Sequence, residues 1–212
     1  MRAWLQTLVW HPDLKPDPER PPRALALAEE VLAAPDADIE AAAYAGYVVA
    51  FYSDDFERGL ARVERAIELC PNCLSAWGSS CLLNAMRNRP EVALERAGQA
   101  LRLSPRDPMA YRIHAGSTIA HVGLRDWEGV LADVERGRVF ENSVTSFRHF
   151  EIVALVHLGR MERARLLARR FIAVNPGFTI GKFRALRRTV RALDFTVYEP
   201  VIEGMAAAGI PE

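Results

Sequence analysis

The sequence predicts an all-α protein built from repeated pairs of antiparallel helices, and three observations carry this prediction. A proline closes similar helical text at Pro71, Pro105 and Pro176, and the first two prolines lie 34 residues apart. Small residues recur at helical spacing before each of them. No stretch alternates apolar and polar residues with a period of two for long enough to suggest a strand. A repeat of this length indicates an elongated stack in which each unit buries its apolar face against its neighbours.

The small residues align from one unit to the next. In the unit that ends at Pro105 they are Ala93, Ala97 and Ala100. A longer middle unit ends at Asn142, where the other units have proline. Paired helices cross closely where small side chains let the ridges of one enter the grooves of the other, so we expect these positions to be buried. The equivalent positions in the other units are Gly59, Val63 and Ala66; Val130, Val134 and Gly137; and Ala164, Ala168 and Phe171.

Proline and glycine set the expected helix boundaries. Pro90 suits the first turn of a helix, and the closing prolines stop helices because proline cannot continue one. Gly123 and Gly159 are expected at turns between paired helices. The resulting helices span roughly residues 1–10, 22–33, 38–52, 55–69, 73–87, 90–103, 108–122, 126–139, 144–158, 161–174, 178–192 and 196–208.

The two ends of the chain depart from the repeat. Residues 1–176 are expected to form about five repeats, the first degenerate or truncated and ending near Pro35, and residues 177–212 to form capping helices. At the other end, Trp4, Leu5, Leu8 and Trp10 give an apolar helix with no helix before it. Large exposed apolar surfaces usually mark interfaces, so this helix predicts either a homodimer or a poorly soluble monomer. We interpret Met1 either as a fragment boundary or as a start codon inside a longer ancestral array.

The period and the closing proline identify the repeat as the tetratricopeptide helix-turn-helix, which forms a right-handed superhelical solenoid. Residues 54–212 resemble one set of such proteins, the repeat regions that follow the catalytic domain of bacterial class III adenylate cyclases or the winged-helix domain of bacterial transcriptional regulators. The matching text is Arg89–Ala97, Arg102–Pro108, Leu158–Ala164 and the ending Gly209–Glu212. Nothing in the chain resembles a cyclase domain or a winged helix. The resemblance therefore implies only a regulatory or docking arm.

Composition sets further limits. Lys plus Arg and Asp plus Glu both number 27, so no overall charge favours nucleic acid or membrane as a partner. Three cysteines are too few for a disulfide framework, and no secretory signal is visible. The longest apolar run, Ala41–Tyr52, is too short to span a bilayer. These features predict a cytoplasmic protein.

No motif in the sequence predicts catalysis, a cofactor or a metal. Cys70 and Cys73 have the spacing of redox and zinc motifs, but a helix leads into them and Pro71 is the closing proline of a repeat. A structural role is therefore the preferred interpretation, with a thiol or metal role as the alternative. His114 pairs with His121, and His149 with His157, on single helix faces, without the glutamate of a metalloprotease motif. Nucleophile turns and phosphate loops are absent.

Charge is unevenly distributed along the chain. The first 55 residues are acidic, and residues 160–192 hold ten bases and one acid. Clustered arginines attract phosphate backbones, so a nucleic-acid-associated regulator is the alternative function. This basic face would consist of Arg169, Arg170, Arg187, Arg188 and Arg191.

The preferred functional site is the concave face, which the first helix of each repeat lines in tetratricopeptide proteins. An apolar, aromatic groove with a few cationic groups suits an amphipathic helix, or a packed segment of a sister domain, laid apolar side down. The sequence thus predicts a non-catalytic protein–protein interaction module of bacterial signalling or transcription control. The alternative for part of this set is simple packing between helices. The groove residues would be Tyr44, Val48, Phe51, Tyr52, Leu82, Met86, Arg112, His149, Val153 and His157.

Overall fold

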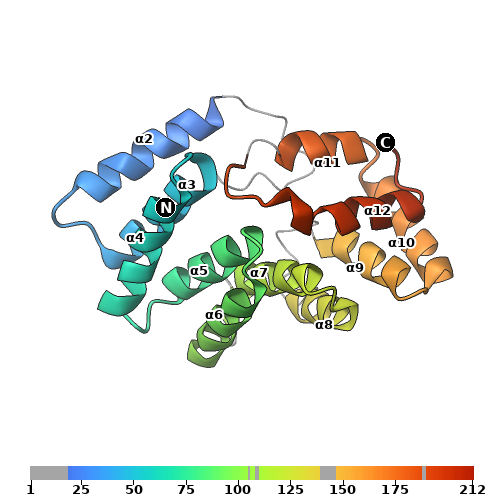
Figure 1. The fold of residues 1–212 in the computed structure, drawn as a ribbon, viewed down its shortest axis with the longest axis horizontal. Coiled ribbons are helices and arrows are strands. Elements are labelled where there is room, and N and C mark those ends of the chain that lie inside the picture. The colour runs from blue at the N-terminus through green and yellow to red at the C-terminus, as the bar shows by residue number, and fades with distance from the viewer. Residues whose placement is uncertain (1–18, 105, 108–109, 139–146, 188–189) are drawn as a thin grey trace.

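The computed structural model describes residues 19–104, 106–107, 110–138, 147–187 and 190–212, and these residues form an all-α protein (Figure 1). The predicted all-α class is confirmed. The expected helix over residues 1–10 lies outside the described residues. The eleven helices are α2 (Arg20–Ala33), α3 (Ile39–Tyr52), α4 (Phe56–Leu69), α5 (Leu74–Met86), α6 (Pro90–Leu103), α7 (Ala110–Gly123), α8 (Trp127–Gly137), α9 (Phe147–His157), α10 (Met161–Val174), α11 (Ile180–Arg187) and α12 (Glu199–Ala207), with a 3-10 turn at Phe195–Val197.

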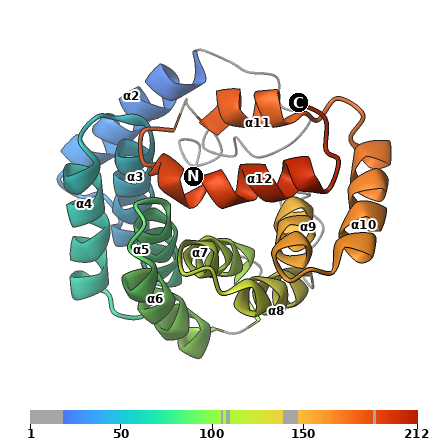
Figure 2. The same ribbon diagram turned by 45° about the vertical axis from the view of Figure 1, so that its right-hand side comes forward.

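Consecutive helices pack in pairs, α3 with α4, α5 with α6, α7 with α8 and α9 with α10. The pairs follow one another around an arc, and Figure 2 shows the first helix of each pair on the inside and the second on the outside. Neighbouring inner helices also pack together, α3 against α5 and α5 against α7. This sequential arrangement is consistent with a helical repeat.

The aligned small residues are buried where the outer helices meet their partners. Ala93, Ala97 and Ala100 of α6 are buried, and so are the equivalent positions of α4, α8 and α10. At Gly59 the approach is closest, because a Cβ there would lie 2.2 Å from the backbone nitrogen of Ala50. The period read from the sequence therefore located the contact line of each helix pair.

Successive outer helices are joined by ion pairs at a constant offset. Arg89 pairs with Glu57 at 2.7 Å and Arg96 with Glu64 at 3.2 Å, each across 32 residues of sequence. Arg160 and Glu128 make the same contact across 32 residues further along. Exposed pairs of this kind add little stability. Their constant offset nevertheless shows that corresponding positions of neighbouring pairs face one another.

The turns that follow α5, α7 and α9 each contain a left-handed residue, at Asn88, Arg125 and Gly159, and of these Gly159 was expected at its turn. Gly159 has a φ of 72°, as its place at a turn requires. Gly123 instead ends α7, and the left-handed residue of that turn is Arg125, with a φ of 58°. Gly123 thus lies directly before the turn, which ends at Asp126, whose side chain caps α8 by accepting from the Gly129 N–H at 3.0 Å.

The C-terminal part differs most from the expected boundaries. The helix expected over 178–192 ends at Arg187, and residues 190–194 form a turn. The helix expected over 196–208 begins at Glu199, after the 3-10 turn. In Figure 2, α12 runs across the inside of the arc rather than extending its end. The C-terminal segment therefore covers part of the inner face.

Candidate functional site on the inner face of the arc

The predicted groove residues lie on the inner helices but do not form an open groove. Four belong to α3, two to α5, one to α7 and three to α9. Tyr44 and His157 are half-buried and the others are buried, with Arg112 5% and Leu82 8% exposed. The C-terminal segment, residues 190–212, covers much of this face. The residues concerned are Tyr44, Val48, Phe51, Tyr52, Leu82, Met86, Arg112, His149, Val153 and His157.

Main-chain hydrogen bonds attach the C-terminal segment to two inner helices. The Arg191 N–H donates to the Phe51 carbonyl at 2.9 Å, and the Asp194 N–H donates to the Met86 carbonyl at 2.8 Å. Both carbonyls belong to the last turns of α3 and α5, where the helix itself supplies no donor. The segment therefore satisfies acceptors that an isolated arc would leave to water.

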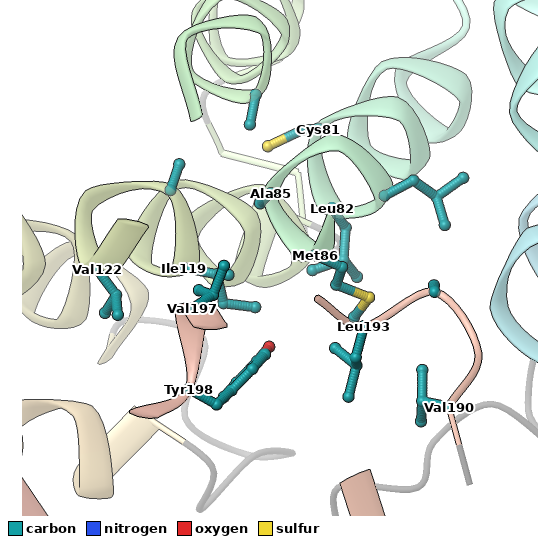
Figure 3. Packing of buried hydrophobic residues seen from close by; sticks show 14 of the residues in the cluster. Cys81, Leu82, Ala85, Met86, Ile119, Val122, Val190, Leu193, Val197 and Tyr198 are labelled. Atoms are coloured by element: carbon teal, nitrogen blue, oxygen red, sulfur yellow. The ribbon is translucent and has the colours of Figure 1, made fainter. Parts of the chain in front are cut away.

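Apolar side chains fill the space beneath these hydrogen bonds. Figure 3 shows Leu193 beside Met86 and Leu82, and Val197 beside Ile119. All of them are buried and belong to the same hydrophobic cluster. The inner face is thus completed by residues from the end of the chain.

Helix α12 lies on α9 through a glycine. A Cβ on Gly204 would lie 2.9 Å from Cγ1 of Val153 and 3.2 Å from its Cα, so only glycine fits without a shift of one helix. His157 stacks on the Trp127 ring, with centroids 4.1 Å apart, and its Nε2 lies 2.9 Å from the Pro200 carbonyl, to which it donates. The sequence prediction missed Gly204, although Gly204 and Ala208 are small residues four positions apart.

The buried face of α12 is that of an amphipathic helix. Glu199, Glu203 and Ala206 are exposed on the opposite side. The inner face therefore holds a helix with its apolar side down. The buried positions are Pro200, Val201, Gly204, Met205 and Ala208.

Two side chains that were predicted to be cationic and accessible, Arg187 and His149, are buried. Arg187 is 1% exposed, and its guanidinium lies 4.6 Å from the centre of the Phe183 ring and 4.4 Å from that of Tyr198. Burial lowers the pKa of Arg187 to about 10, against the opposing effect of Tyr198. Burial, together with the charge of Arg187, lowers the pKa of His149 to about 3, so this imidazole is neutral at neutral pH.

A small pocket remains between the beginnings of α3, α5 and α7. It has a volume of about 220 Å³, and Tyr44, Ser75 and Arg112 line it together with the acids Glu40 and Asp107. The Arg112 guanidinium lies 5.4 Å from the centre of the Tyr44 ring and 4.9 Å from that of Tyr47. Arg112, one of the predicted cationic groove residues, thus lines a pocket.

The two histidines of α7 converge on an acid that the sequence analysis did not select. Nδ1 of His114 lies 3.5 Å from Oδ1 of Asp133, and Nε2 of His121 lies 3.4 Å from Oδ2. Burial raises the pKa of Asp133, but hydrogen bonds with His114 and Ser117 outweigh it and hold that pKa below its usual value. Their shared helix face is therefore confirmed. In the part of the chain that the structure describes, no group of three or more His, Cys, Asp or Glu side chains has a metal-binding arrangement.

The predicted basic face is not continuous. Arg169 and Arg170 are exposed on α10, whereas Arg187 is buried and Arg188 lies outside the described residues. Arg191 is exposed, with its Nε 3.4 Å from Oδ1 of Asp54. The inclusion of Arg187 was wrong because its side chain is buried against the rings of Phe183 and Tyr198.

The cysteine pair forms the turn between α4 and α5. The Cys73 N–H donates to the Cys70 carbonyl at 2.9 Å, and the Trp77 indole donates to the Pro71 carbonyl at 2.8 Å. Both thiols are free and half-buried, while Cys81 is buried and burial raises its pKa to about 12. These contacts give the Cys70–Cys73 turn a structural role; a thiol or metal role stays an untested alternative.

Comparison with known proteins assigns no family. No protein-family model matches the chain, and no curated protein sequence matches it either. None of the helices among the described residues combines the length and the apolar character needed to cross a bilayer. The chain is an all-α protein of sequentially paired helices whose inner face holds its own C-terminal segment.

Proposed function

We propose that this protein is a non-catalytic protein–protein interaction module of the tetratricopeptide type. One observation carries the proposal. The inner face of the arc accommodates an amphipathic helix, α12, with its apolar side down and Gly204 against Val153. Binding a helix through its apolar face is a common way to recognise a protein segment. The inner face therefore has the chemistry of a helix-binding surface.

The proposed partner is a protein or peptide segment, or a sister catalytic or DNA-binding domain. The resemblance to the repeat regions of bacterial adenylate cyclases and winged-helix regulators favours a regulatory or docking arm in bacterial signalling or transcription control. A partner would first engage the part of the inner face that residues 190–212 leave uncovered, where Tyr44 and Arg112 line the pocket. Tyrosine and arginine are enriched among the residues that dominate binding energy at interfaces.

Site-specific crosslinking in cells of the organism that produces this protein tests the proposal. A photoreactive amino acid replaces Tyr44 in one variant and the exposed Arg165 of α10 in a matched control. We expect Tyr44 to yield one dominant protein adduct that the Arg165 position lacks. In a binding assay with that protein, Arg112→Ala should weaken binding by about 1–2 kcal/mol with helical content unchanged. Equal adducts from the two positions, or unchanged affinity, would contradict an inner-face site.

A further inference from the structure

We propose that the surface of α9 on which α12 lies, around Val153 and His157, is an exchangeable helix-binding site. We call this surface the seat of α12, and we propose that residues 190–212 are a built-in competitor for it. The partner that this seat fits is an amphipathic helix with glycine facing Val153. The inference rests on the proposed function and names both the partner class and its regulation. Four features of the described residues support it.

The first feature is that the C-terminal part is closed on itself. The Ile180 N–H donates to the Pro211 carbonyl at 2.8 Å, joining the start of α11 to the end of the chain. Arg184 pairs with Glu212 at 3.0 Å, and Nη1 of Arg187 donates to the Tyr198 hydroxyl at 3.3 Å. These contacts join residues 190–212 to α11, which keeps the segment beside the surface that α12 occupies.

The second feature is that the segment contacts the arc as a ligand would. It reaches the ends of α3 and α5 through main-chain donors, and it reaches α9 through Gly204 and the His157–Pro200 hydrogen bond. Each contact joins residues far apart in sequence. None of them belongs to the repeated packing between paired helices.

The third feature is the polar character of the contact. Docking of residues 190–212 places the Tyr198 ring 4.4 Å from the Arg187 guanidinium, and this cation is 1% exposed in the docked state. Desolvation of a cation opposes docking and offsets part of the apolar burial. Such a contact opens more readily than the apolar packing between paired helices, and elements that open separately from the rest are common at binding surfaces.

The fourth feature is that α12 has the properties of the predicted ligand, an amphipathic helix. Its apolar side lies on the inner helices, and its acids Glu199 and Glu203 face solvent. The requirement for a small residue at Gly204 gives the site a selectivity that an ordinary apolar surface lacks. A competing helix needs the same small residue at the equivalent position.

The test measures binding of a fluorescent peptide, residues 190–212, to the full-length chain. Gly204→Leu places a side chain against Val153 and should vacate the seat, whereas Ala206→Leu changes an exposed residue of the same helix. A tethered segment competes at an effective concentration near the millimolar range. We therefore expect Gly204→Leu to bind the peptide at least tenfold more tightly than the wild type and Ala206→Leu do. A peptide carrying the Gly204→Leu change should not bind.

Hydrogen exchange on the wild-type chain tests the proposal without any variant. If the seat is exchangeable, the amides of α12 exchange through an opening that leaves α9 and α5 protected. Exchange of α12 only together with α9, at the same denaturant dependence, would overturn the proposal, as would absence of peptide binding to a folded Gly204→Leu chain. A concentration-dependent dimer that dissociates in excess peptide would show that the seat binds the C-terminal segment of a second copy. That outcome would overturn the proposal that the partner is a helix of another protein.

The two proposals fail in different ways. The peptide experiment needs no partner. If the Gly204→Leu chain binds the peptide, the exchangeable seat is supported even when Tyr44 yields no crosslinked protein. A crosslinked protein that binds wild type and Gly204→Leu equally would leave the interaction module intact and remove the competitor role of α12.

Discussion

Small side chains determine how closely the paired helices approach. Ala168 of α10 is 2% exposed and sits at the position that Ala97 occupies in α6. Ala168→Leu forces extra volume into this contact, and overpacking typically costs about 1–3 kcal/mol. We expect a lower melting temperature for this variant. Ala173→Leu, at an exposed position of the same helix, is the control, and equal melting temperatures for both variants would mean that the repeat alignment is wrong.

The same scale shows where sequence reasoning stops. The buried small residues could be predicted because a fixed period places them on the same helix face in each unit. Arg187 could not, because its burial depends on the rings of Phe183 and Tyr198, which meet only after the chain has turned. Asp133 was missed for a similar reason, since its partners lie on the neighbouring helix.

At the scale of elements, the repeated helices were predictable and the place of the last one was not. The boundaries of α6 and α10 agree with the expected ones, because Pro90 begins α6, Gly159 lies in the turn before α10, and Pro105 and Pro176 follow the two helices. The amphipathic pattern of α12 predicts that one face is buried, but it does not say against which surface. An end cap and a helix laid inside the arc have the same pattern. The open groove was expected for this reason.

The contact between α9 and α11 makes stability depend on pH. His149 has a pKa of about 3 in the folded chain, and an unfolded histidine has its ordinary value near 6.5. Between these values the unfolded state binds one more proton. The contribution of neutral His149 is therefore complete above pH 6.5 and is lost as the pH falls toward 3.

Urea denaturation at several pH values checks this expectation. The free energy of unfolding should fall by about 1.4 kcal/mol for each unit below pH 6 through this group alone. His149→Gln removes the titrating group. The slope of the unfolding free energy against pH should therefore be smaller for that variant, by the amount that corresponds to about one bound proton. Identical slopes for the two chains would show that His149 is accessible to protons in the folded state.

At the scale of the whole molecule, the uneven charge distribution is partly compensated within the chain. The acidic beginning and the basic end meet, because the C-terminal segment returns to α3 and places Arg191 beside Asp54. Arg187 is withdrawn into the interior. The basic face that the sequence suggested is thereby reduced among the described residues, and the exposed pair Arg169 and Arg170 on α10 serves to test the nucleic-acid alternative.

Reversing the charge of Arg169 and Arg170 distinguishes protein binding at the inner face from nucleic-acid binding. Arg169→Glu with Arg170→Glu alters exposed side chains on the outer helix α10, far along the arc from the pocket of Tyr44 and Arg112. Binding of a protein segment at the inner face should change by less than about 0.5 kcal/mol, as for surface substitutions away from a site. Arg112→Ala should have the larger effect. Fluorescence anisotropy with the crosslinked partner, and with single- and double-stranded oligonucleotides at several salt concentrations, measures both. If the arginine pair is decisive and binding collapses steeply as salt rises, the ligand is a nucleic acid, because released counterions give that dependence.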